Sequence, residues 1–448
     1  MKFFVVDMTH GGLIIASELA KLPKTQVFVW DIYGTVDESI MEKYSNLGLK
    51  FVENDISKSF DELVVVAPVH CNMVSNVDMT HHEAVGHILN NKINVPIIEV
   101  TGVKGKTSVV WILKEILKDL NPLVLSSLGA EVFDGDGWRM LKQNISITPA
   151  SIIESWKMAE NYEIGVCIFE TSLGGTGLAD VGILTNIAED YPIASNSSLA
   201  SIAKAQIFKS KLVACDMASF NSEYFGFKEK INTFDGRPKN SETNANLSAT
   251  NIKLGFNITE FDVQISNFKT LAYNVLEGSF NVITFAPSHV HINNILAAVA
   301  ASLMLGISEE KITDGLSKFK GLKGRTTIRE SEGIRIVEEI NPGLNVTAVK
   351  ESIKMMVDLD DVAVIFGGKY GITCEEIDEK SVSQVLNCIK NDYMLILVDE
   401  LGYNVKKFIT LDNTYYANLD DAVKFAEKNN CSNILLIYRS NYSDVKKR

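Results

Sequence analysis

Residues 97–117 constrain the fold more than any other part of the chain. A short strand-like run at residues 97–100, apolar except for Glu99, leads into a glycine-containing loop, and a helical pattern follows at residues 108–117. Parallel strands need a long crossover connection, usually a helix, and this order of strand, loop and helix supplies one. The segment therefore predicts an α/β fold.

The same alternation recurs on both sides of that segment, and the length of 448 residues suggests three domains. We expect an N-terminal Rossmann-like domain (1–96), a central domain with a mixed sheet (97–325) and a smaller C-terminal Rossmann-like domain (326–448). Residues 235–279 are rich in Asn, Ser and Thr, and we expect them to form an antiparallel extension of the central domain.

The composition fits a packed enzyme and argues against several other classes. The net charge of −13 opposes sequence-independent binding to nucleic acid, which requires a basic face. The six cysteines include no CxxC pair, so neither a disulfide framework nor a zinc knuckle is indicated. Since no apolar run has the length of a signal peptide or a membrane span, we expect a soluble cytoplasmic protein.

The loop after residue 100 has the composition of a phosphate-binding site. Its glycines let backbone N–H groups close around phosphate, the Lys106 side chain can reach the β and γ oxygens, and the Thr107 hydroxyl can hold Mg²⁺. Two residues separate the glycines where the common loop has four, and an ordinary Gly-Lys turn is the alternative. The residues expected to contact ATP here are Gly102, Val103, Lys104, Gly105, Lys106, Thr107 and Ser108.

Glu170 is a second candidate, because it lies between a buried strand and a glycine-rich loop. A carboxylate in that position can complete the oxygen shell of Mg²⁺ or orient a metal-bound water, although a helix-capping glutamate is the alternative. The polar residues 185–190 end the next strand. We expect them at the same edge of the sheet, where α/β proteins bind ligands.

Taken in order, these motifs resemble the Mur ligase superfamily. The matching landmarks are residues 101–107, residues 170–172, residues 185–190, Lys204, Asn293 with Asn294, and Gly324 with Arg325. The resemblance implies an ATP- and Mg²⁺-dependent ligase that activates a carboxylate as an acyl phosphate, with a central P-loop ATPase domain and an N-terminal substrate domain.

The resemblance also implies roles for single residues. Lys204 would be carbamylated and help to bind a second Mg²⁺, Asn294 would contact the adenine, and Arg325 would contact the γ-phosphate; Lys106 and Glu170 complete the catalytic set. A solvated lysine and a helix cap are the alternatives for Lys204 and Asn294.

Two departures from the superfamily pattern stand out. Tyr191 occupies the position of a histidine metal ligand, so that ligand does not carry over to this chain. Residues 338–345 replace a stretch that usually holds the nucleotide and an amino-acid nucleophile, so an ordinary amino-acid substrate is not implied.

Histidines are concentrated near the N-terminus, where five of the seven precede residue 96. The spacing of His81, His82 and His87 excludes a zincin helix, which needs two histidines four residues apart. We expect His10, His81 and His82 on loops at the carboxyl ends of the first strands, where imidazoles suit a substrate with several carboxylates or a metal-bearing ring. The residues predicted to contact the substrate are His10, Gly11, His81, His82, Asn341 and Asn345.

Several short stretches are similar to one branch of the superfamily, the coenzyme F(430) synthetases of methanogenic archaea. These stretches are residues 7–12, 31–34, 67–70, 80–85 and 339–345. The similarity implies that a propionate of a nickel tetrapyrrole is phosphorylated and attacked by a carbon nucleophile of the same molecule, closing the last carbocyclic ring with release of ADP and phosphate. Two alternatives are a Mur-type peptide ligase of archaeal pseudomurein and a P-loop ATPase that binds partners without ligating them.

Overall fold

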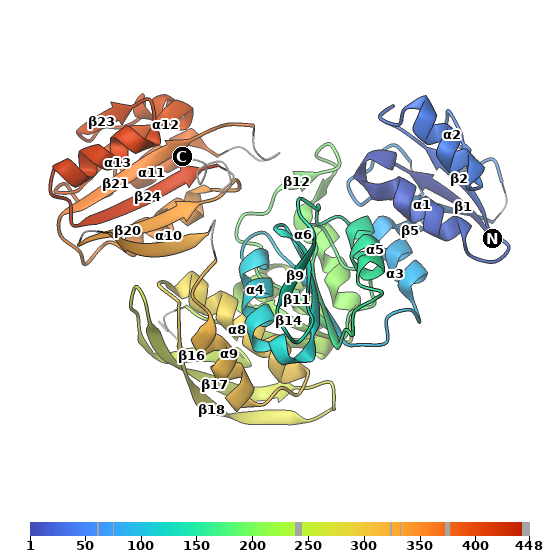
Figure 1. The fold of residues 1–448 in the computed structure, drawn as a ribbon, viewed down its shortest axis with the longest axis horizontal. Helices are drawn as coiled ribbons and strands as arrows, with labels where there is room; N and C mark the ends of the chain where they lie inside the picture. Colours follow the sequence, from blue (N-terminus) through green and yellow to red (C-terminus); the bar gives the residue numbers. More distant parts are fainter. Residues whose placement is uncertain are drawn as a thin grey trace. The chain divides into compact units, whose positions relative to one another are not determined.

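The computed structural model divides into two compact units, each described by itself (Figure 1). The structure describes residues 1–60, 62–74, 76–237, 244–322, 325–331, 333–371 and 377–440. The first unit comprises Met1–Ile252, Phe261–Ile283 and Ile292–Lys318, and the second comprises Lys253–Glu260, Thr284–His291 and Phe319–Arg448.

The first sheet has five parallel strands in the order β3-β2-β1-β4-β5. Its strands are β1 (Lys2–Val6), β2 (Gln26–Trp30), β3 (Leu49–Phe51), β4 (Leu63–Ala67) and β5 (Met79–Thr80), and its helices are η1 (Met8–Gly12), α1 (Leu13–Ala20), α2 (Glu38–Asn46) and α3 (His81–Leu89). The strand order reverses at β1, because β2 lies on one side of it and β4 on the other. The carboxyl ends of β1 and β4 therefore form a topological switch point, where sheets of this kind bind ligands.

The second sheet is mixed and has eleven strands in the order β18-β17-β16-β15-β14-β11-β6-β10-β7-β8-β9. The strands are β6 (Ile97–Thr101), β7 (Pro122–Ser126), β8 (Gly129–Phe133), β9 (Trp138–Lys142), β10 (Val166–Glu170), β11 (Val181–Leu184), β14 (Leu212–Asp216), β15 (Ile231–Asp235), β16 (Leu247–Lys253), β17 (Thr259–Lys269) and β18 (Val275–Thr284); β12 (Pro192–Ile193) and β13 (Ser198–Leu199) form a separate pair. Strands β7, β10, β6, β11 and β14 run parallel, whereas β8 and β9 are antiparallel additions.

The helices that accompany the second sheet vary widely in length. They are α4 (Lys106–Ile116), η2 (Lys118–Leu120), α5 (Pro149–Met158), α6 (Ala200–Lys204), η3 (Ala205–Lys209), α7 (Met217–Ser219), η4 (Phe220–Tyr224), η5 (Phe225–Lys230), α8 (His289–Met304) and α9 (Glu309–Lys318). Strand β6 lies between β10 and β11, so the segments that follow these three strands meet at one edge of the sheet. That edge carries the predicted phosphate loop.

The third sheet has six strands in the order β19-β20-β24-β21-β22-β23, and only β19 is antiparallel to its neighbour. Its elements are β19 (Thr326–Ser331), β20 (Ile334–Ile340), β21 (Val362–Gly368), β22 (Met394–Val398), β23 (Asn413–Tyr416), β24 (Asn433–Arg439), α10 (Val346–Lys354), α11 (Glu379–Leu386), α12 (Asp399–Lys406) and α13 (Leu419–Lys428). Fully buried strands such as β21 and β24 explain the nearly continuous apolar runs in this part of the sequence.

One hydrophobic cluster joins the first sheet to the second. Phe3 and Val85 belong to the same buried cluster as Leu123 and Ile153, and α3 packs against α5. This shared core explains why both sheets fall within one compact unit. The boundaries predicted at residues 96 and 325 stay predictions.

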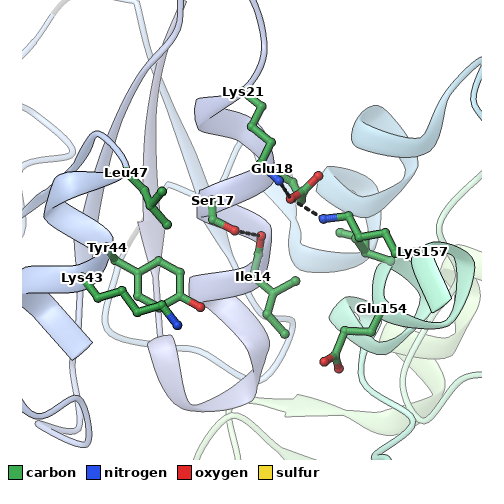
Figure 2. Close-up of a pocket in the computed structure, with 10 residues that line it drawn as sticks. Ile14, Ser17, Glu18, Lys21, Lys43, Tyr44, Leu47, Glu154 and Lys157 are labelled. Atoms are coloured by element: carbon green, nitrogen blue, oxygen red, sulfur yellow. Dashed lines mark hydrogen bonds and ion pairs between the residues drawn. The ribbon is translucent and has the colours of Figure 1, made fainter. Parts of the chain in front are cut away.

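A cavity of about 420 Å³ lies where α1 and α2 meet α5. Figure 2 shows Glu18 between Lys21 and Lys157, and each lysine nitrogen is 2.5 Å from Glu18 Oε1. None of the predicted site residues lines this cavity. Among the described residues, no helix is long and apolar enough to cross a membrane.

Candidate active site

The predicted phosphate loop joins the end of β6 to the start of α4. Gly102 and Gly105 have positive φ angles of 140° and 88°, and a side chain at either position would collide with a neighbour. An added Cβ would lie 2.0 Å from Thr185 Oγ1 at Gly102 and 2.3 Å from Asn294 Oδ1 at Gly105. The glycines are therefore required both for backbone conformation and for close packing.

Lys106 is the first residue of α4, and its ammonium group lies over the loop. Its Nζ donates hydrogen bonds to the carbonyl oxygens of Gly102 and Val103, at 3.0 and 3.3 Å. The amine is thus held beside the backbone groups that would surround a phosphate. Val103, Lys104 and Ser108 lie in the same loop and first helical turn, so the local order of strand, loop and helix is as predicted, whereas contact with ATP stays a prediction.

The segment after β11 braces this loop. The Thr185 hydroxyl and the Asn186 amide donate to the Lys104 carbonyl oxygen, at 2.5 and 3.0 Å. The Val103 amide donates to the Asn186 carbonyl oxygen at 2.8 Å. These bonds hold the loop in one conformation, which favours preorganised binding of a phosphate. The sequence placed residues 185–190 at this edge without indicating that they support the loop.

Thr107 and Glu170, the two predicted Mg²⁺ ligands, are in direct contact and buried. The Thr107 hydroxyl donates to Glu170 Oε1 at 2.9 Å, and the Ser127 amide donates to Glu170 Oε2 at 3.0 Å. The Ser127 hydroxyl lies 3.1 Å from that of Thr107. Three hard oxygen donors beside a phosphate loop suit Mg²⁺. Sequence reasoning missed Ser127, whose one signal was its position directly after the apolar strand β7.

Lys204 ends α6 and is fully buried. Its Nζ donates to the Ser172 carbonyl oxygen at 2.5 Å and lies 5.9 Å from the centre of the Tyr191 ring. Ser172 is two residues from Glu170, so the lysine is close to the predicted metal ligands. Carbamylation of Lys204 and its role as a metal ligand stay predictions.

Two adjacent asparagines of α8 are placed differently. Asn294 is buried, and its Oδ1 lies against Gly105. Its side chain therefore reaches the predicted phosphate loop, which places it near the predicted position of ATP. Asn293 instead bonds to the central sheet, donating to Asp216 Oδ1 at 3.1 Å and accepting from the Gly236 amide at 2.9 Å. The contact of Asn294 with adenine stays a prediction.

Three predicted residues belong to the second compact unit, so their placement at the site stays a prediction. The Arg325 amide donates to the Leu322 carbonyl oxygen at 3.1 Å, and Gly324 lies outside the described residues. Asn341 is buried and donates to Glu339 Oε1 at 2.5 Å. Asn345 caps α10 by accepting from the Ala348 amide at 3.0 Å, which gives it a structural role.

His81 and His82 do not lie on a loop, and that part of the prediction is wrong. They are the first two residues of α3, and both are buried. Thr80 caps the helix and accepts from the Glu83 amide, while the Glu83 carboxylate accepts from the Thr80 amide at 2.7 Å. This reciprocal pair of hydrogen bonds caps the helix at Thr80, so α3 begins at His81. A direct contact of either histidine with the substrate stays a prediction.

Burial also determines the charge of these two imidazoles. Desolvation lowers the pKa of His81 to about 4 and that of His82 to about 3, so both rings are neutral near pH 7. His81 Nε2 lies 3.0 Å from the Val6 carbonyl oxygen, and the positive charge of Lys204 contributes to the low pKa of His82. The start of α3 is therefore close to the predicted catalytic lysine.

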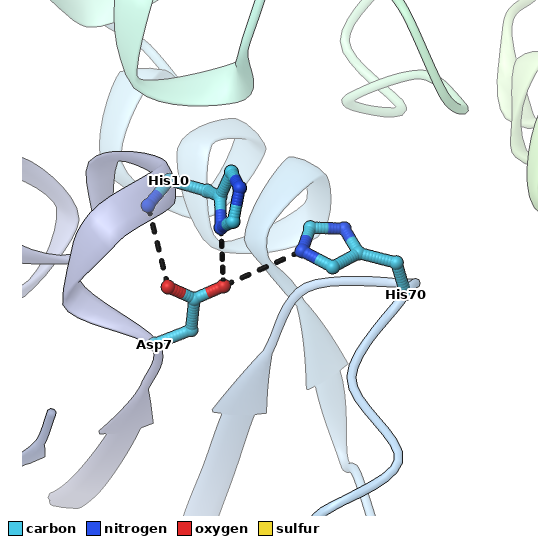
Figure 3. Close-up of side chains that lie close together, drawn as sticks. All are labelled: Asp7, His10 and His70. Atoms are coloured by element: carbon cyan, nitrogen blue, oxygen red, sulfur yellow. Dashed lines mark hydrogen bonds and ion pairs between the residues drawn. The ribbon is translucent and has the colours of Figure 1, made fainter. Parts of the chain in front are cut away.

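Three side chains at the switch point of the first sheet form what we name the Asp7 cluster, comprising Asp7, His10 and His70 (Figure 3). Asp7 is buried and follows β1. His10 Nδ1 lies 2.6 Å and His70 Nε2 lies 3.4 Å from Asp7 Oδ2. Burial raises the pKa of Asp7, but its close contacts with His70 and His10 outweigh that effect and lower its pKa to about 2. Sequence reasoning assigned a role to His10 but none to Asp7 or His70.

Direct contacts connect the first sheet to the segments around Glu170 and Lys204. The Thr80 hydroxyl donates to Gln206 Oε1 at 3.0 Å, two residues after Lys204. An added Cβ at Gly86 would lie 2.3 Å from the Thr176 carbonyl oxygen, and one at Gly11 would lie 2.5 Å from the Ala150 side chain. Gly11 is therefore a packing residue between η1 and α5, and its predicted contact with substrate stays a prediction.

Comparison with known proteins identifies the family. Residues 328–441 match the family model described as Coenzyme F430 synthetase CfbE, C-terminal domain. The coenzyme F(430) synthetase of Methanosarcina acetivorans is 30% identical over 423 residues, covering 86% of this chain and 87% of the relative. That of Methanocaldococcus jannaschii is 30% identical over 438 residues, covering 94% and 96%. The chain belongs to the coenzyme F(430) synthetase family.

A solved structure supports the same fold. The MurF ligase from Thermotoga maritima in complex with ADP has a TM-score of 0.61 and 12% sequence identity, covering 94% of this chain and 93% of that chain. The family and the fold together confirm the predicted three-domain Mur ligase architecture and identify the chain as an ATP-dependent ligase of the Mur type. A P-loop ATPase that ligates nothing does not fit this family.

Proposed function

We propose that this chain closes the last carbocyclic ring of a nickel tetrapyrrole, using ATP to activate a propionate side chain as an acyl phosphate. The main support is the 30% identity to two coenzyme F(430) synthetases over most of the chain. The activated carbonyl would lose phosphate to a carbon nucleophile of the same molecule, so the products are the cyclised tetrapyrrole, ADP and phosphate. A pseudomurein peptide ligase has less support, because both of these relatives are named coenzyme F(430) synthetase.

We assign the phosphate groups of ATP to the loop of residues 102–108. Its backbone amides and the Lys106 ammonium group would surround the β- and γ-phosphates, and positioning together with electrostatic stabilisation supplies most of the catalysis in phosphoryl transfer. Arg325 is the predicted additional cation on the γ-phosphate, and Asn294 the predicted contact with adenine. The division into domains at residues 96 and 325 is part of the same proposal.

The oxygen donors of Thr107, Ser127 and Glu170 would hold Mg²⁺, which neutralises charge on the transferred phosphoryl group. Their contacts of 2.9 to 3.1 Å place them together before any ion arrives. Lys204, buried beside Ser172, is the candidate for a carbamylated ligand of a second ion. Tyr191 lies by Lys204 where the superfamily has a histidine, so a second ion would have a different set of ligands here.

The test uses the purified chain with ATP, Mg²⁺ and the nickel tetrapyrrole acid in which the last ring is open. We expect ADP, phosphate and cyclised product in equal amounts, and a product mass lower than that of the acid by one water. Hydroxylamine should trap the acyl phosphate as a hydroxamate. The pseudomurein alternative is tested in parallel with amino acids and a nucleotide-linked peptide precursor. ADP release that depends on an amino acid, with none on the tetrapyrrole acid, would overturn the proposal.

A further inference from the structure

The Asp7 cluster lies where the topology of the first sheet predicts a ligand. Asp7 directly follows β1, His10 lies in η1, and His70 follows β4. Strands β1 and β4 are neighbours, and the strand order changes direction between them. Ligands of α/β sheets bind outside the carboxyl ends of the strands at such a point. The cluster is therefore in a ligand-binding position for reasons independent of its chemistry.

The Asp7 carboxylate accepts hydrogen bonds from the turn that follows it. Its Oδ1 accepts from the amides of Thr9 and His10 at 2.9 and 3.3 Å, and its Oδ2 accepts from His10 Nδ1 at 2.6 Å. Asp7 also has a φ of 70°, which is rare for a residue with a side chain. This conformation turns the carboxylate back onto the following turn. The carboxylate therefore positions His10.

The bond to Asp7 determines which nitrogen of His10 is available. In the neutral ring, Nδ1 carries the proton that it donates to the carboxylate, so Nε2 carries a lone pair. Figure 3 shows the second ring nitrogen pointing away from Asp7. Among the described residues Nε2 has no hydrogen-bond partner, and the side chain is 44% exposed. An imidazole held by a carboxylate with its other nitrogen free is the common arrangement of histidine metal ligands.

The surroundings of His10 suit a flat, largely apolar ligand. Tyr33 is 53% exposed, and its ring lies edge-on to His10 with 6.1 Å between centroids. His70 packs edge-on against His10 on another side, with 4.6 Å between centroids. An exposed aromatic ring beside an available imidazole can pack against the face of a macrocycle.

We propose that His10, positioned by Asp7, is an axial ligand of the nickel ion in the tetrapyrrole substrate. This inference rests on the proposed function. One available nitrogen is too few for tight binding of an aqueous ion, but it is sufficient for a nickel ion whose other ligands are the four nitrogens of the ring. Imidazole is a suitable ligand for nickel. The Asp7 cluster would thus orient the substrate through its metal.

The experiment titrates the enzyme into the nickel tetrapyrrole acid and follows visible absorption and nickel X-ray absorption. With the unmodified enzyme we expect one added nitrogen ligand on nickel. With His10→Ala this ligand should be lost, the KM for the tetrapyrrole should rise about tenfold or more, and the KM for ATP should be unchanged. Added imidazole should restore the spectrum of His10→Ala, and Asp7→Asn should weaken the spectral change. His87→Ala, an exposed histidine of α3, is the matched control and should behave like the unmodified enzyme.

Each contrary outcome has a distinct meaning. Normal turnover by the unmodified enzyme, with the same nickel spectrum and KM in His10→Ala, would overturn the axial ligand and leave the proposed function standing. If the unmodified enzyme neither binds nor converts the tetrapyrrole acid, both proposals fail. Titration with aqueous Ni²⁺ is a further arm. Tight binding that depends on Asp7, His10 and His70 would show a three-ligand ion site and overturn the proposed axial ligand.

Discussion

The phosphate loop and the Asp7 cluster both follow the carboxyl ends of parallel strands in the same compact unit, yet they are held together differently. The loop occupies seven consecutive residues, and its backbone groups accept hydrogen bonds from the side chains of Lys106, Thr185 and Asn186. The Asp7 cluster joins residues 63 positions apart through side chains. Under the proposed function, the loop would bind the phosphates of ATP in the step that Mur-type ligases share, whereas the Asp7 cluster would contact the part of the substrate that differs between them. Changes in the loop should stop chemistry, whereas changes near the cluster should alter selectivity or stability.

The largest effect is expected for Lys106→Ala. Its ammonium group lies over the loop carbonyls, and its loss removes a cation beside the predicted site of the β- and γ-phosphates. We expect ADP formation to fall at least about 100- to 1,000-fold with the fold intact. ADP release is measured beside Lys118→Ala, which changes a lysine just beyond the other end of α4. Normal activity of folded Lys106→Ala would remove the phosphate-loop assignment.

Glu170→Gln should have the next largest effect and should act through the metal. The amide would place an N–H₂ group against the Thr107 hydroxyl or the Ser127 amide, which both donate to the carboxylate. We expect the Mg²⁺ concentration for half-maximal activity to rise about tenfold or more.

Glu99→Gln provides a matched control for that measurement. Glu99 is a buried carboxylate on the neighbouring strand β6, and it bonds to Thr176. Its substitution should leave the Mg²⁺ requirement unchanged. If Glu170→Gln and Glu99→Gln had the same Mg²⁺ dependence, Glu170 would be structural.

The two regions also differ in how far the sequence predicts them. The loop could be predicted because strand, glycines, lysine and helix are adjacent, and Glu170 because it ends an apolar strand. The contact between Thr107 and Glu170 required the fold, since 63 residues separate them. The role of Asp7 could not be predicted from the sequence. It depends on a positive φ at Asp7 and on the position of His70, which lies in the segment after β4.

The helix that begins at His81 has a local signal in the sequence. Thr80 and Glu83 have the spacing of a capping box, which is a local signal for a helix start. The number of histidines near the N-terminus indicates a substrate site but says nothing about backbone conformation. The capping hydrogen bonds of Thr80 and Glu83 do constrain the backbone, and they start a helix at His81.

The histidines of α3 should make stability depend on pH. Burial lowers the pKa of His82 to about 3 and that of His81 to about 4. Below pH 6.5 the unfolded chain binds protons that the folded chain does not, so stability falls as the pH falls toward 4, by about 1.4 kcal/mol per histidine for each pH unit. His82→Gln should reduce the difference in Tm between pH 7.5 and pH 5.5 by roughly 1–2 °C.

His87→Gln is the control for this measurement, because His87 is exposed in the same helix. It should leave the difference in Tm close to that of the unmodified chain. An equal change in His82→Gln and His87→Gln would mean that burial of His82 is not the cause of the pH dependence.

The smallest effect is expected at the contact shown in Figure 2, where Glu18 bonds to both Lys21 and Lys157. Lys157 is 42% exposed, and Lys21 remains to pair with Glu18 when Lys157 is removed. Exposed ion pairs contribute little, so Lys157→Ala should lower the free energy of unfolding by about 0.2–1 kcal/mol. ADP release should be unchanged, because the adjoining cavity contains no predicted site residue.

A denaturation series on Lys21→Ala, Lys157→Ala and the double variant measures the coupling of the two lysines. A loss above about 2 kcal/mol, or a fall in ADP release, would mean that this ion pair, rather than the apolar cluster shared by the two sheets, holds the first sheet in place for catalysis.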